Sequence, residues 1–343
     1  MKILIDIGHP GHVHFYRSAI QELKKRGSDI LVTARDKEVV FQLLDAFKIP
    51  YLNRGEAYVG LAGKAKGLWK VNKFLRKAAR DFQPDVLTGV HNPYIAQTAA
   101  LMRKPSVIFT DTEHATLANL LTFPFATEIC TPAWFKKDLG EKHVRYDGFK
   151  EQAYLHPKYF TPNAGVVRQL GLGRKEPYAV VRLVSWKAAH DFSQEGIINP
   201  YRLVEQLEQY YRVFLSSETR APLGLEDHRL PTNPEDLQSV LSFASLCVSE
   251  GSTTATEAGL LGTPSVYVSS LVGSMGNFDE LQKLGLVHSY RSLPEAESKI
   301  AELCKDKKAK KQWQKKSAAV MKEKTDVTKF IAERLEIHAR SVQ

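Results

Sequence analysis

The chain has 343 residues, of which 43% are hydrophobic and 25% are charged, and this composition excludes both a disordered chain and a single small module. A chain of this length is expected to form two domains. Lysine and arginine number 48 against 38 for aspartate and glutamate, a net charge of +10 that predicts an anionic partner such as nucleotide phosphates, nucleic acid or an acidic membrane surface.

The spacing of the cysteines and the length of the apolar runs indicate in which cellular compartment the protein is expected. Cys130, Cys247 and Cys304 are far apart and form no CxxC or Cys/His pairing, which argues against a disulfide scaffold and a structural zinc site and favours a reducing environment. The apolar run at residues 3–7 is too short for the core of a signal peptide. No run reaches the roughly 18 to 20 apolar residues that span a bilayer. We therefore expect a cytoplasmic protein.

Strands and helices are expected to alternate through the first half of the chain. An apolar run at residues 2–7 is followed by a Gly/His/Pro loop, and apolar residues then recur at helical spacing over residues 16–26. This alternation predicts a parallel sheet and a Rossmann-like domain over residues 1–160. Further strands are expected at residues 30–33, 50–52, 85–89, 106–110 and 128–131, and further helices at 39–47, 67–81 and 94–102.

A stretch rich in proline and glycine, residues 149–177, is expected to link this domain to a second one. The alternation then resumes and predicts a second Rossmann-like domain over residues 175–325. Its expected strands are residues 178–184, 212–216, 246–249 and 265–268, and its expected helices 203–211, 234–243 and 253–261. A last amphipathic helix is expected at about residues 328–339.

The first loop that follows a strand carries three histidines. Ligands bind parallel α/β sheets at the carboxyl ends of the strands, where Gly8 and Gly11 allow close approach and the next helix N-terminus favours an anion. His12 is a candidate general base, and His9 and His14 are candidate contacts to an acceptor or sugar. Alternatively, these histidines cap the helix or fill space. The loop lacks the Walker and dinucleotide-binding glycine patterns, which disfavours ATP and NAD chemistry of those kinds.

The second loop of interest, residues 249–264, joins a strand to a helix through a glycine and small hydroxyl residues. Free backbone N–H groups and the helix dipole at such a start form a site for phosphate. The carboxylate of Glu257 is a candidate acceptor of hydrogen bonds from ribose hydroxyls. Simple Ser/Thr capping with a solvated glutamate is the alternative. With Gly11 from the first loop, the candidate nucleotide-sugar contacts are Gly251, Ser252, Thr253, Thr254 and Glu257.

Residues 109–115 form a third loop after a strand, and helix capping is the alternative to a functional role there. Glu113 is a candidate to deprotonate a hydroxyl. Weaker candidates follow other strands, including residues 273–277, which could close over a ligand. The candidate phosphate contacts are Arg182, Ser185, Lys187 and Ser217, and the candidate acceptor or sugar contacts are His91, Asn92, His114 and Asn277.

In chain order, these motifs resemble those of GT-B glycosyltransferases, most closely the type that adds N-acetylglucosamine to complete lipid II. Residues 11–13 (Gly-His-Val) are similar to a Gly-Gly-His loop of that type, and residues 106–119 to its strand and His-Glu-Gln-Asn segment. Residues 249–264 are similar to its donor-binding segment, which implies diphosphate contacts at Gly251, Ser252 and Thr253 and a ribose contact at Glu257. The order and length of the whole chain resemble the domain-of-unknown-function family 354.

The resemblance implies two Rossmann-like domains facing each other across a cleft, with the acceptor on the first domain and the nucleotide sugar on the second. It also implies that residues 326–343 pack back on the first domain. The implied reaction moves a sugar from a nucleotide diphosphate, with UDP as the guess, to a hydroxyl of a cell-surface glycan or lipid-linked precursor. His12 is the expected base, and Glu113 is either the alternative base or its orienting partner.

Stereochemistry and cofactors follow from the same resemblance. Six residues separate Glu250 from Glu257, whereas retaining enzymes of this fold often have seven, so inversion is favoured. The N-terminus of the helix after Gly251, aided by Arg182 or Lys187, is expected to stabilise the departing diphosphate, so no metal ion or other cofactor is expected.

Two other functions stay open. Residues 250–264 are also similar to a segment of the non-hydrolysing UDP-N-acetylglucosamine 2-epimerases, which implies epimerisation at C2 as the alternative reaction. The other possibility is a sugar-nucleotide-binding protein without catalysis. No signature of a nucleic-acid-binding module is present, so no nucleic acid partner is expected.

The excess positive charge is concentrated in two places. Residues 61–80 hold seven basic residues and no acidic one, interleaved with apolar residues, a composition typical of a helix attracted to anionic lipid. This predicts peripheral attachment to the inner face of the plasma membrane, and a solvated helix face is the alternative. The second concentration, residues 305–324, is partly balanced by acidic residues and predicts an exposed helix.

Overall fold

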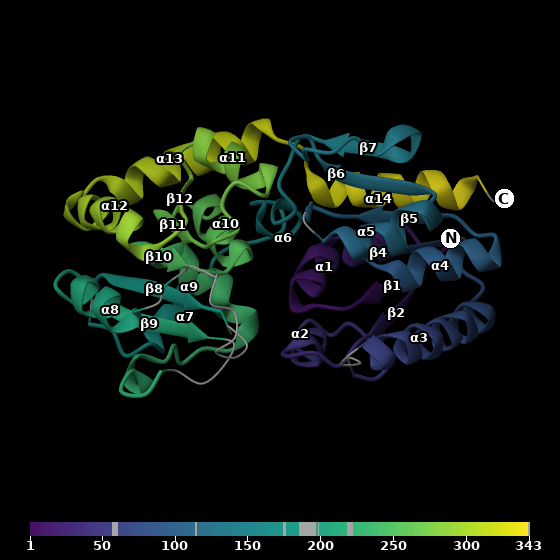
Figure 1. Ribbon diagram of the computed structural model, residues 1–343, viewed down its shortest axis with the longest axis horizontal. Helices are drawn as coiled ribbons and strands as arrows, with labels where there is room; N and C mark the ends of the chain where they lie inside the picture. Colours follow the sequence, from purple (N-terminus) through teal and green to yellow (C-terminus); the bar gives the residue numbers. More distant parts are fainter. Residues whose placement is uncertain are drawn as a thin grey trace. The chain divides into compact units, whose positions relative to one another are not determined.

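The computed structural model describes residues 1–343 except 57–60, 114, 174–175, 185–196, 198, 218–221 and 342–343, and at residues 61–66 and 68 it describes the helical backbone. The chain divides into two compact units (Figure 1). Unit 1 comprises Met1–Tyr159 with Thr325–Gln343, and unit 2 comprises Phe160–Lys324. Each unit is built around its own parallel sheet.

The sheet of unit 1 has the strand order β3-β2-β1-β4-β5-β6-β7, and its neighbouring strands are parallel. The strands are β1 (Lys2–Ile7), β2 (Asp29–Ala34), β3 (Leu52–Asn53), β4 (Val86–Val90), β5 (Ser106–Phe109), β6 (Glu128–Pro132) and β7 (His143–Tyr146). The helices are α1 (Pro10–Lys25), α2 (Val40–Ala46), α3 (Leu61–Phe82), α4 (Pro93–Met102), α5 (Thr116–Thr122), α6 (Gln152–Leu155) and α14 (Val327–Arg340).

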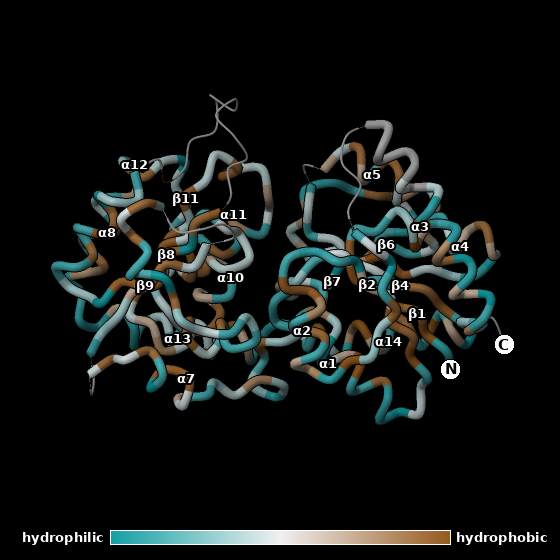
Figure 2. The backbone as a smooth tube through the Cα atoms, turned by 90° about the horizontal axis from the view of Figure 1, so that it is seen from below, coloured by the Kyte–Doolittle hydropathy of each residue, from teal (hydrophilic) through white to brown (hydrophobic). Residues whose placement is uncertain are grey.

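Strands β1 and β4 are buried along almost their whole length because helices cover both faces of the sheet. Figure 2 shows hydrophobic backbone concentrated around these two strands. On one face, Leu4, Leu87 and Ile108 contribute to a core that also holds Val71 and Leu75 of α3. The apolar side of α3 is therefore turned toward the sheet, whereas its Trp69 is 65% exposed.

The last helix, α14, packs on α1 within unit 1. Its residues Val327, Ile331 and Leu335 are fully buried, and the spacing of four residues puts them on one helix face. On the interior side, Arg334 and His338 both contact the carboxylate of Glu128 on β6. The end of the chain thus completes the core of unit 1.

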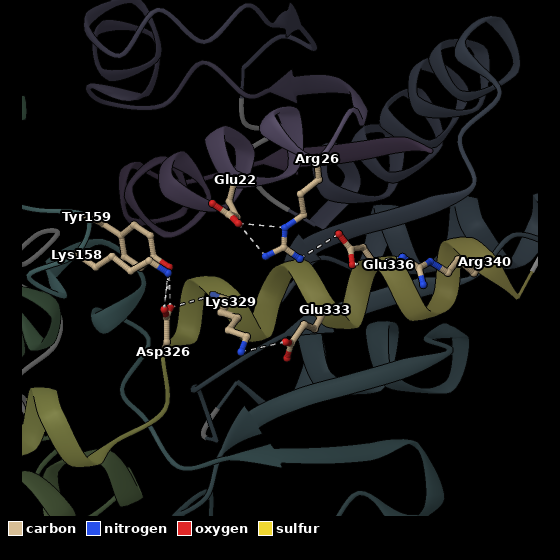
Figure 3. A network of polar contacts seen from close by, with 9 residues as sticks. All are labelled: Glu22, Arg26, Lys158, Tyr159, Asp326, Lys329, Glu333, Glu336 and Arg340. Carbon is tan, nitrogen blue, oxygen red and sulfur yellow. Dashed lines mark hydrogen bonds and ion pairs between the residues drawn. The ribbon is translucent and has the colours of Figure 1, made fainter.

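Polar contacts also tie the outer side of α14 to unit 1 (Figure 3). Asp326 caps the helix by accepting from the backbone N–H of Lys329 at 3.0 Å, and it also accepts from the Tyr159 hydroxyl at 2.8 Å. Arg26 of α1 bridges Glu22 at 2.8 Å and Glu336 at 3.1 Å. Because these ion pairs are partly exposed, each adds only about 0–1 kcal/mol of stability.

The sheet of unit 2 has the strand order β12-β11-β10-β8-β9, and its neighbouring strands are also parallel. The strands are β8 (Tyr178–Leu183), β9 (Arg212–Ser217), β10 (Leu246–Ser249), β11 (Ser265–Val268) and β12 (Val287–Tyr290). The helices are α7 (Ala164–Arg168), α8 (Pro200–Glu208), α9 (Leu237–Phe243), α10 (Ser252–Leu260), α11 (Gly276–Lys283), α12 (Leu293–Lys305) and α13 (Ala309–Glu323). Val180, Val240 and Ala258 are among the fully buried residues of its core.

Each sheet has one point at which the order of its strands reverses. In unit 1 the reversal lies between β1 and β4, and in unit 2 it lies between β8 and β10. In open α/β sheets, ligands bind outside the carboxyl ends of the strands at such a reversal. The loops that follow these four strands are therefore where the fold places a binding site in each unit.

Several expected elements differ from the observed ones. Helix α1 begins at Pro10 and not at residue 16, because proline suits the first helical turn and His9 caps it. The expected linker, residues 149–177, contains α6 and α7. Strands β7 and β12 were not expected, since their sequences, HVRY and VHSY, are polar edge strands without an apolar run. Residues 273–277 are not one open loop, because α11 starts at Gly276.

Candidate functional site

In unit 2, the loop after β10 ends on the N-terminus of helix α10. Gly251 precedes α10 in an extended conformation (φ −83°, ψ 120°), and no side-chain cap is made among the described residues. The N–H groups of the first helical turn have no partner within a helix. They and the helix dipole favour an anion at this position.

Hydrogen bonds between Ser249 and Gly251 hold the loop, and a side chain added at Gly251 would not clash with its neighbours. The Ser249 hydroxyl donates to the Gly251 carbonyl at 2.7 Å, and the Gly251 N–H donates back to the Ser249 oxygen at 3.0 Å. A Cβ added at Gly251 would lie 3.5 Å from Cγ of Arg182 and 3.6 Å from Cγ1 of Val184, which are ordinary contact distances. Substitution of Gly251 is therefore compatible with the fold.

Arg182 lies at the same edge of unit 2, near the end of β8. Its guanidinium donates to the hydroxyl of Ser216 on β9 at 2.9 Å, and Ser217, the last residue of β9, is half-buried. Glu250 is buried and accepts from the backbone N–H groups of Val184 at 3.0 Å and Ile197 at 2.8 Å. The predicted contacts Ser185 and Lys187 lie outside the described residues.

Two predicted contacts in unit 2 lie in its interior. The carboxylate of Glu257 is buried and accepts from the side-chain amide of Gln238 on α9 at 3.1 Å. Burial, and then the nearby Glu257, raise the pKa of the Cys247 thiol on β10 to about 12, so Glu257 faces the sheet. Its predicted role as a ribose contact stays a prediction. Asn277 is also buried, in the first turn of α11, and does not belong to a closing loop.

In unit 1, the three histidines belong to α1 or cap it. Nδ1 of His9 accepts from the Gly11 N–H at 3.1 Å, so Gly11, His12 and His14 lie within the helix and not in a loop. The His14 ring is buried against Phe47 and Tyr154, with ring centroids 5.7 and 5.2 Å away. His14 therefore fills space in the interior, and its predicted contact with an acceptor or sugar stays a prediction.

His12 occupies the first turn of α1 at the reversal between β1 and β4. Its Nδ1 accepts a long hydrogen bond, 3.4 Å, from the backbone N–H of Gly8. Burial, followed by the nearby His9, Lys150, Lys37 and Arg35, lowers the pKa of His12 well below its ordinary value of 6.5. The ring is therefore neutral at pH 7 and can accept a proton.

The loop after β4 holds a strained histidine and a buried asparagine. His91 has a positive φ of 45°, which is unfavourable for a residue other than glycine and is often found at functional sites. Its Nδ1 is hydrogen-bonded to the Thr110 hydroxyl at 3.3 Å, which joins the ends of β4 and β5. Asn92 caps α4 and donates to Asp6 at 2.6 Å. Asn92 therefore holds this loop in place, and its predicted contact with an acceptor or sugar stays a prediction.

The loop after β5 contains Glu113, which is also buried. Its Oε1 accepts from the backbone N–H of Lys136 at 3.2 Å, and its carbonyl accepts from Nζ of Lys137 at 3.2 Å. β5 is two strands from β1 in the sheet, so this loop starts about 10 Å from the end of β1, which leads into the helix that holds His12. Both predicted roles of Glu113, as a base or as the orienting partner of His12, stay predictions. His114 lies outside the described residues.

The sequence patterns missed several charged residues at this edge. Nζ of Lys150 lies 2.8 Å from Asp111 and belongs to the cations that lower the pKa of His12. Arg35 and Arg54 follow β2 and β3, one and two strands beyond β1. A basic residue directly after an expected strand was a usable signal for Arg35, whereas β3 is too short to mark Arg54.

Within the described residues, no group of three or more histidine, cysteine, aspartate or glutamate side chains could hold a metal ion. Among the helices they form, none combines the length and apolarity that a bilayer crossing requires.

Solved structures with known activities share this architecture. A UDP-GlcNAc 2-epimerase from Neisseria meningitidis bound to UDP-GlcNAc is 14% identical, with a TM-score of 0.71 over 98% of this chain and 99% of that chain. A glycosyltransferase from Streptomyces sp. SF2575 is 14% identical, with a TM-score of 0.62 over 96% and 99%. The spinosyn forosaminyltransferase is 13% identical, with a TM-score of 0.66 over 99% of each chain.

These likenesses and the two parallel sheets define a GT-B-like protein with two Rossmann-like domains, so the predicted fold class is confirmed. The chain belongs to the family described as protein of unknown function DUF354, whose model matches residues 1–331. An uncharacterized protein of Methanocaldococcus jannaschii is 24% identical over 289 residues, which cover 80% of this chain and 84% of that protein.

Proposed function

We propose that the protein is a glycosyltransferase that moves a sugar from a nucleotide diphosphate, with UDP as the first candidate, to an acceptor hydroxyl. The observation that carries the proposal is the uncapped N-terminus of α10 at the strand reversal of unit 2. A diphosphate there would receive hydrogen bonds from the first-turn N–H groups after Gly251. Arg182 at the same edge would add a positive charge.

In this proposal, unit 1 supplies the base. Nδ1 of neutral His12, exchanging its long hydrogen bond from the Gly8 N–H for one from the acceptor hydroxyl, would take the proton of that hydroxyl as the bond from the oxygen to the sugar C1 forms. The bond from C1 to the diphosphate oxygen breaks, and the departing negative charge is met by the α10 N–H groups and Arg182. The proposal therefore requires no metal ion. Glu250 is occupied by two backbone N–H groups, which supports inversion without a glutamate nucleophile.

Epimerisation of the nucleotide sugar at C2 is the second candidate. It is favoured by the TM-score of 0.71 to an epimerase whose structure holds UDP-GlcNAc. An epimerase needs acid and base groups on both sides of C2 but no acceptor. The requirement for an acceptor separates the two reactions.

The test is incubation of the purified full chain with UDP-GlcNAc and a panel of other nucleotide sugars, monitored by proton NMR with and without a membrane glycan and lipid extract. Nucleotide release that requires the extract supports transfer. A new C2 epimer without the extract overturns transfer in favour of epimerisation. UDP binding without any turnover in the complete panel would instead indicate a binding protein without catalysis.

We also propose that a lipid-linked acceptor brings the protein to the inner face of the plasma membrane, in the synthesis of a cell-surface polysaccharide. The support is on α3, where exposed Trp69 lies beside Lys73, whose Nζ is 5.2 Å from the ring centroid. Because Val71 and Leu75 pack into the core, the described part of this surface is basic and includes the exposed Trp69. Salt-sensitive flotation with anionic vesicles, reduced by Trp69→Ala, would support attachment, and no flotation would contradict it.

A further inference from the structure

Two arginines are adjacent at the carboxyl edge of unit 1. Thr33 pairs with Leu52 and Ala34 with Asn53, so Arg35 and Arg54 are the next residues in the same register. Their backbones continue the ladder, because Arg35 donates to Ile7 at 2.9 Å and Arg54 donates to Ala34 at 2.9 Å. Like charges at paired positions on neighbouring strands are unfavourable, so this arrangement needs an explanation.

A buried carboxylate neutralises one of the two arginines. Nε of Arg54 lies 2.7 Å from Oδ1 of Asp6, and both side chains are almost completely buried. The same carboxylate also accepts from the Thr33 hydroxyl at 2.6 Å and from the Asn92 amide at 2.6 Å. Asp6 is thus fully used in holding Arg54 and the ends of β1, β2 and β4 together.

Arg35 has weaker compensation, because Asp6 and Glu38 attract its guanidinium only from beyond ion-pair distance. Its Nε is buried and has no hydrogen-bond partner among the described residues, and no carboxylate of those residues lies within ion-pair distance of it. Burial, and then the repulsion from Arg54, lower the pKa of its guanidinium. A buried N–H donor such as this Nε, which has no partner among the described residues, costs free energy. An anion between the two guanidinium groups would remove that cost.

The position of the pair suits a ligand of the proposed reaction. A Cβ added at Gly8 would lie 3.4 Å from Nη2 of Arg54, so Arg54 lies beside the start of the segment that leads to His12. Arg35 is close enough to His12 to lower its pKa. An anion held by the two arginines would therefore lie near the proposed base.

We propose that Arg35 and Arg54 form a binding site in unit 1 for an anionic group, a phosphate or a carboxylate, carried by the acceptor. Guanidinium groups bind both anions through paired N–H donors. The assignment of the anion to the acceptor rests on the proposed function, whereas the anion site itself does not. An acceptor of this class is a lipid-linked or glycan phosphate, or a glycan with an acidic sugar.

The test uses inorganic phosphate and glucuronate as probes, titrated by calorimetry into the full chain saturated with UDP so that the site in unit 2 is filled. Arg35→Gln should weaken binding of the preferred anion at least tenfold. The matched control is Arg76→Gln, which removes the same charge from an exposed position on α3 and should bind the anion like the wild type. Preference for phosphate or for glucuronate identifies the source of the anion.

The unfolding temperature distinguishes a role of Arg35 in anion binding from a role in stabilising the fold. If Arg35 serves the anion and not the fold, Arg35→Gln should unfold at the same temperature as the wild type or higher without anion and should lose the anion-dependent increase. Equal anion affinity in Arg35→Gln and wild type, or no anion binding to the wild type, overturns the proposal. Arg35→Lys, which keeps the charge but loses the paired donors, should have intermediate affinity.

The two proposals fail separately. If UDP does not bind, the proposed function fails, and the anion titrations are then carried out without UDP. Anion binding that depends on Arg35 would in that case still establish the site. If UDP binds with equal affinity to wild type and Arg35→Gln but anion affinity is unchanged by the substitution, the function stands and the anion site is wrong.

Discussion

The two units share a parallel-sheet architecture but differ in what stands at the strand reversal. In unit 2 the edge consists mainly of backbone N–H groups, a glycine and small hydroxyl side chains, while the carboxylates of Glu250 and Glu257 are engaged within the unit. In unit 1 the edge carries His12, Lys150 and two arginines. The first kind of edge suits fixed recognition of a diphosphate, and the second suits proton transfer and recognition of a charged group.

Substitution of His12 should have the largest effect, and it tests the assignment of proton transfer to unit 1. His12→Gln removes the proposed base and should lower the rate of acceptor-dependent UDP release by about 10²- to 10⁴-fold. UDP affinity should stay unchanged, because the nucleotide is assigned to unit 2. His156→Gln, a histidine of unit 1 away from this edge, is the control. A rate close to that of the wild type in His12→Gln would exclude the assignment.

The same substrate assay gives a pH dependence. Because the pKa of His12 is lowered by burial and nearby cations, the base is deprotonated above that pKa. The rate should therefore fall on the acid side with a midpoint below 6.5. A midpoint above 6.5 would show that another group limits the rate.

The stability of unit 1 should depend on helix α14, which packs on α1 within that unit. Burial raises the pKa of Glu128, but hydrogen bonds from His338 and Arg334 outweigh it and lower the pKa to about 2. Arg334→Met would leave this buried carboxylate undercompensated and should reduce the free energy of unfolding by about 2–3 kcal/mol in chemical denaturation. Arg340→Met, at an exposed pair on the same helix, should change it by less than about 0.5 kcal/mol.

The buried histidines should give a smaller effect on stability. Burial lowers the pKa values of His12 and His14 in unit 1 and of His288 in unit 2, so the unfolded chain binds more protons below pH 6.5. The free energy of unfolding should fall as the pH decreases from 7 to 5, by up to about 1.4 kcal/mol for each unit of pKa shift and each histidine. His14→Phe, which keeps a ring against Tyr154, should reduce this slope. An unchanged slope would contradict the burial of His14.

The sequence was sufficient for the alternation of strands and helices, since buried parallel strands such as residues 86–90 leave continuous apolar runs. The sequence could not distinguish residues at a ligand site from residues packed in the interior, because the same residue types occur in both. His14, Asn92 and Glu257 lie in suitable motifs, but only tertiary contacts decide that their side chains face inward. Arg54 follows a two-residue strand, and its pairing with Asp6 across 48 positions has no local signal.

Calorimetric titration of UDP into the wild type and Gly251→Val tests whether the N–H groups at the start of α10 bind the diphosphate. The Gly251 backbone suits any residue and a Cβ meets only ordinary contacts, so the valine should leave the fold intact while its branches cover the α10 N–H groups. The control is Gly259→Ala, whose Cβ would lie 2.8 Å from the Leu286 carbonyl, and which should lower stability but not affinity for the folded protein. UDP should bind the wild type, and its affinity should be at least tenfold weaker in Gly251→Val. Equal affinity in the two, or no binding to the wild type, would contradict it.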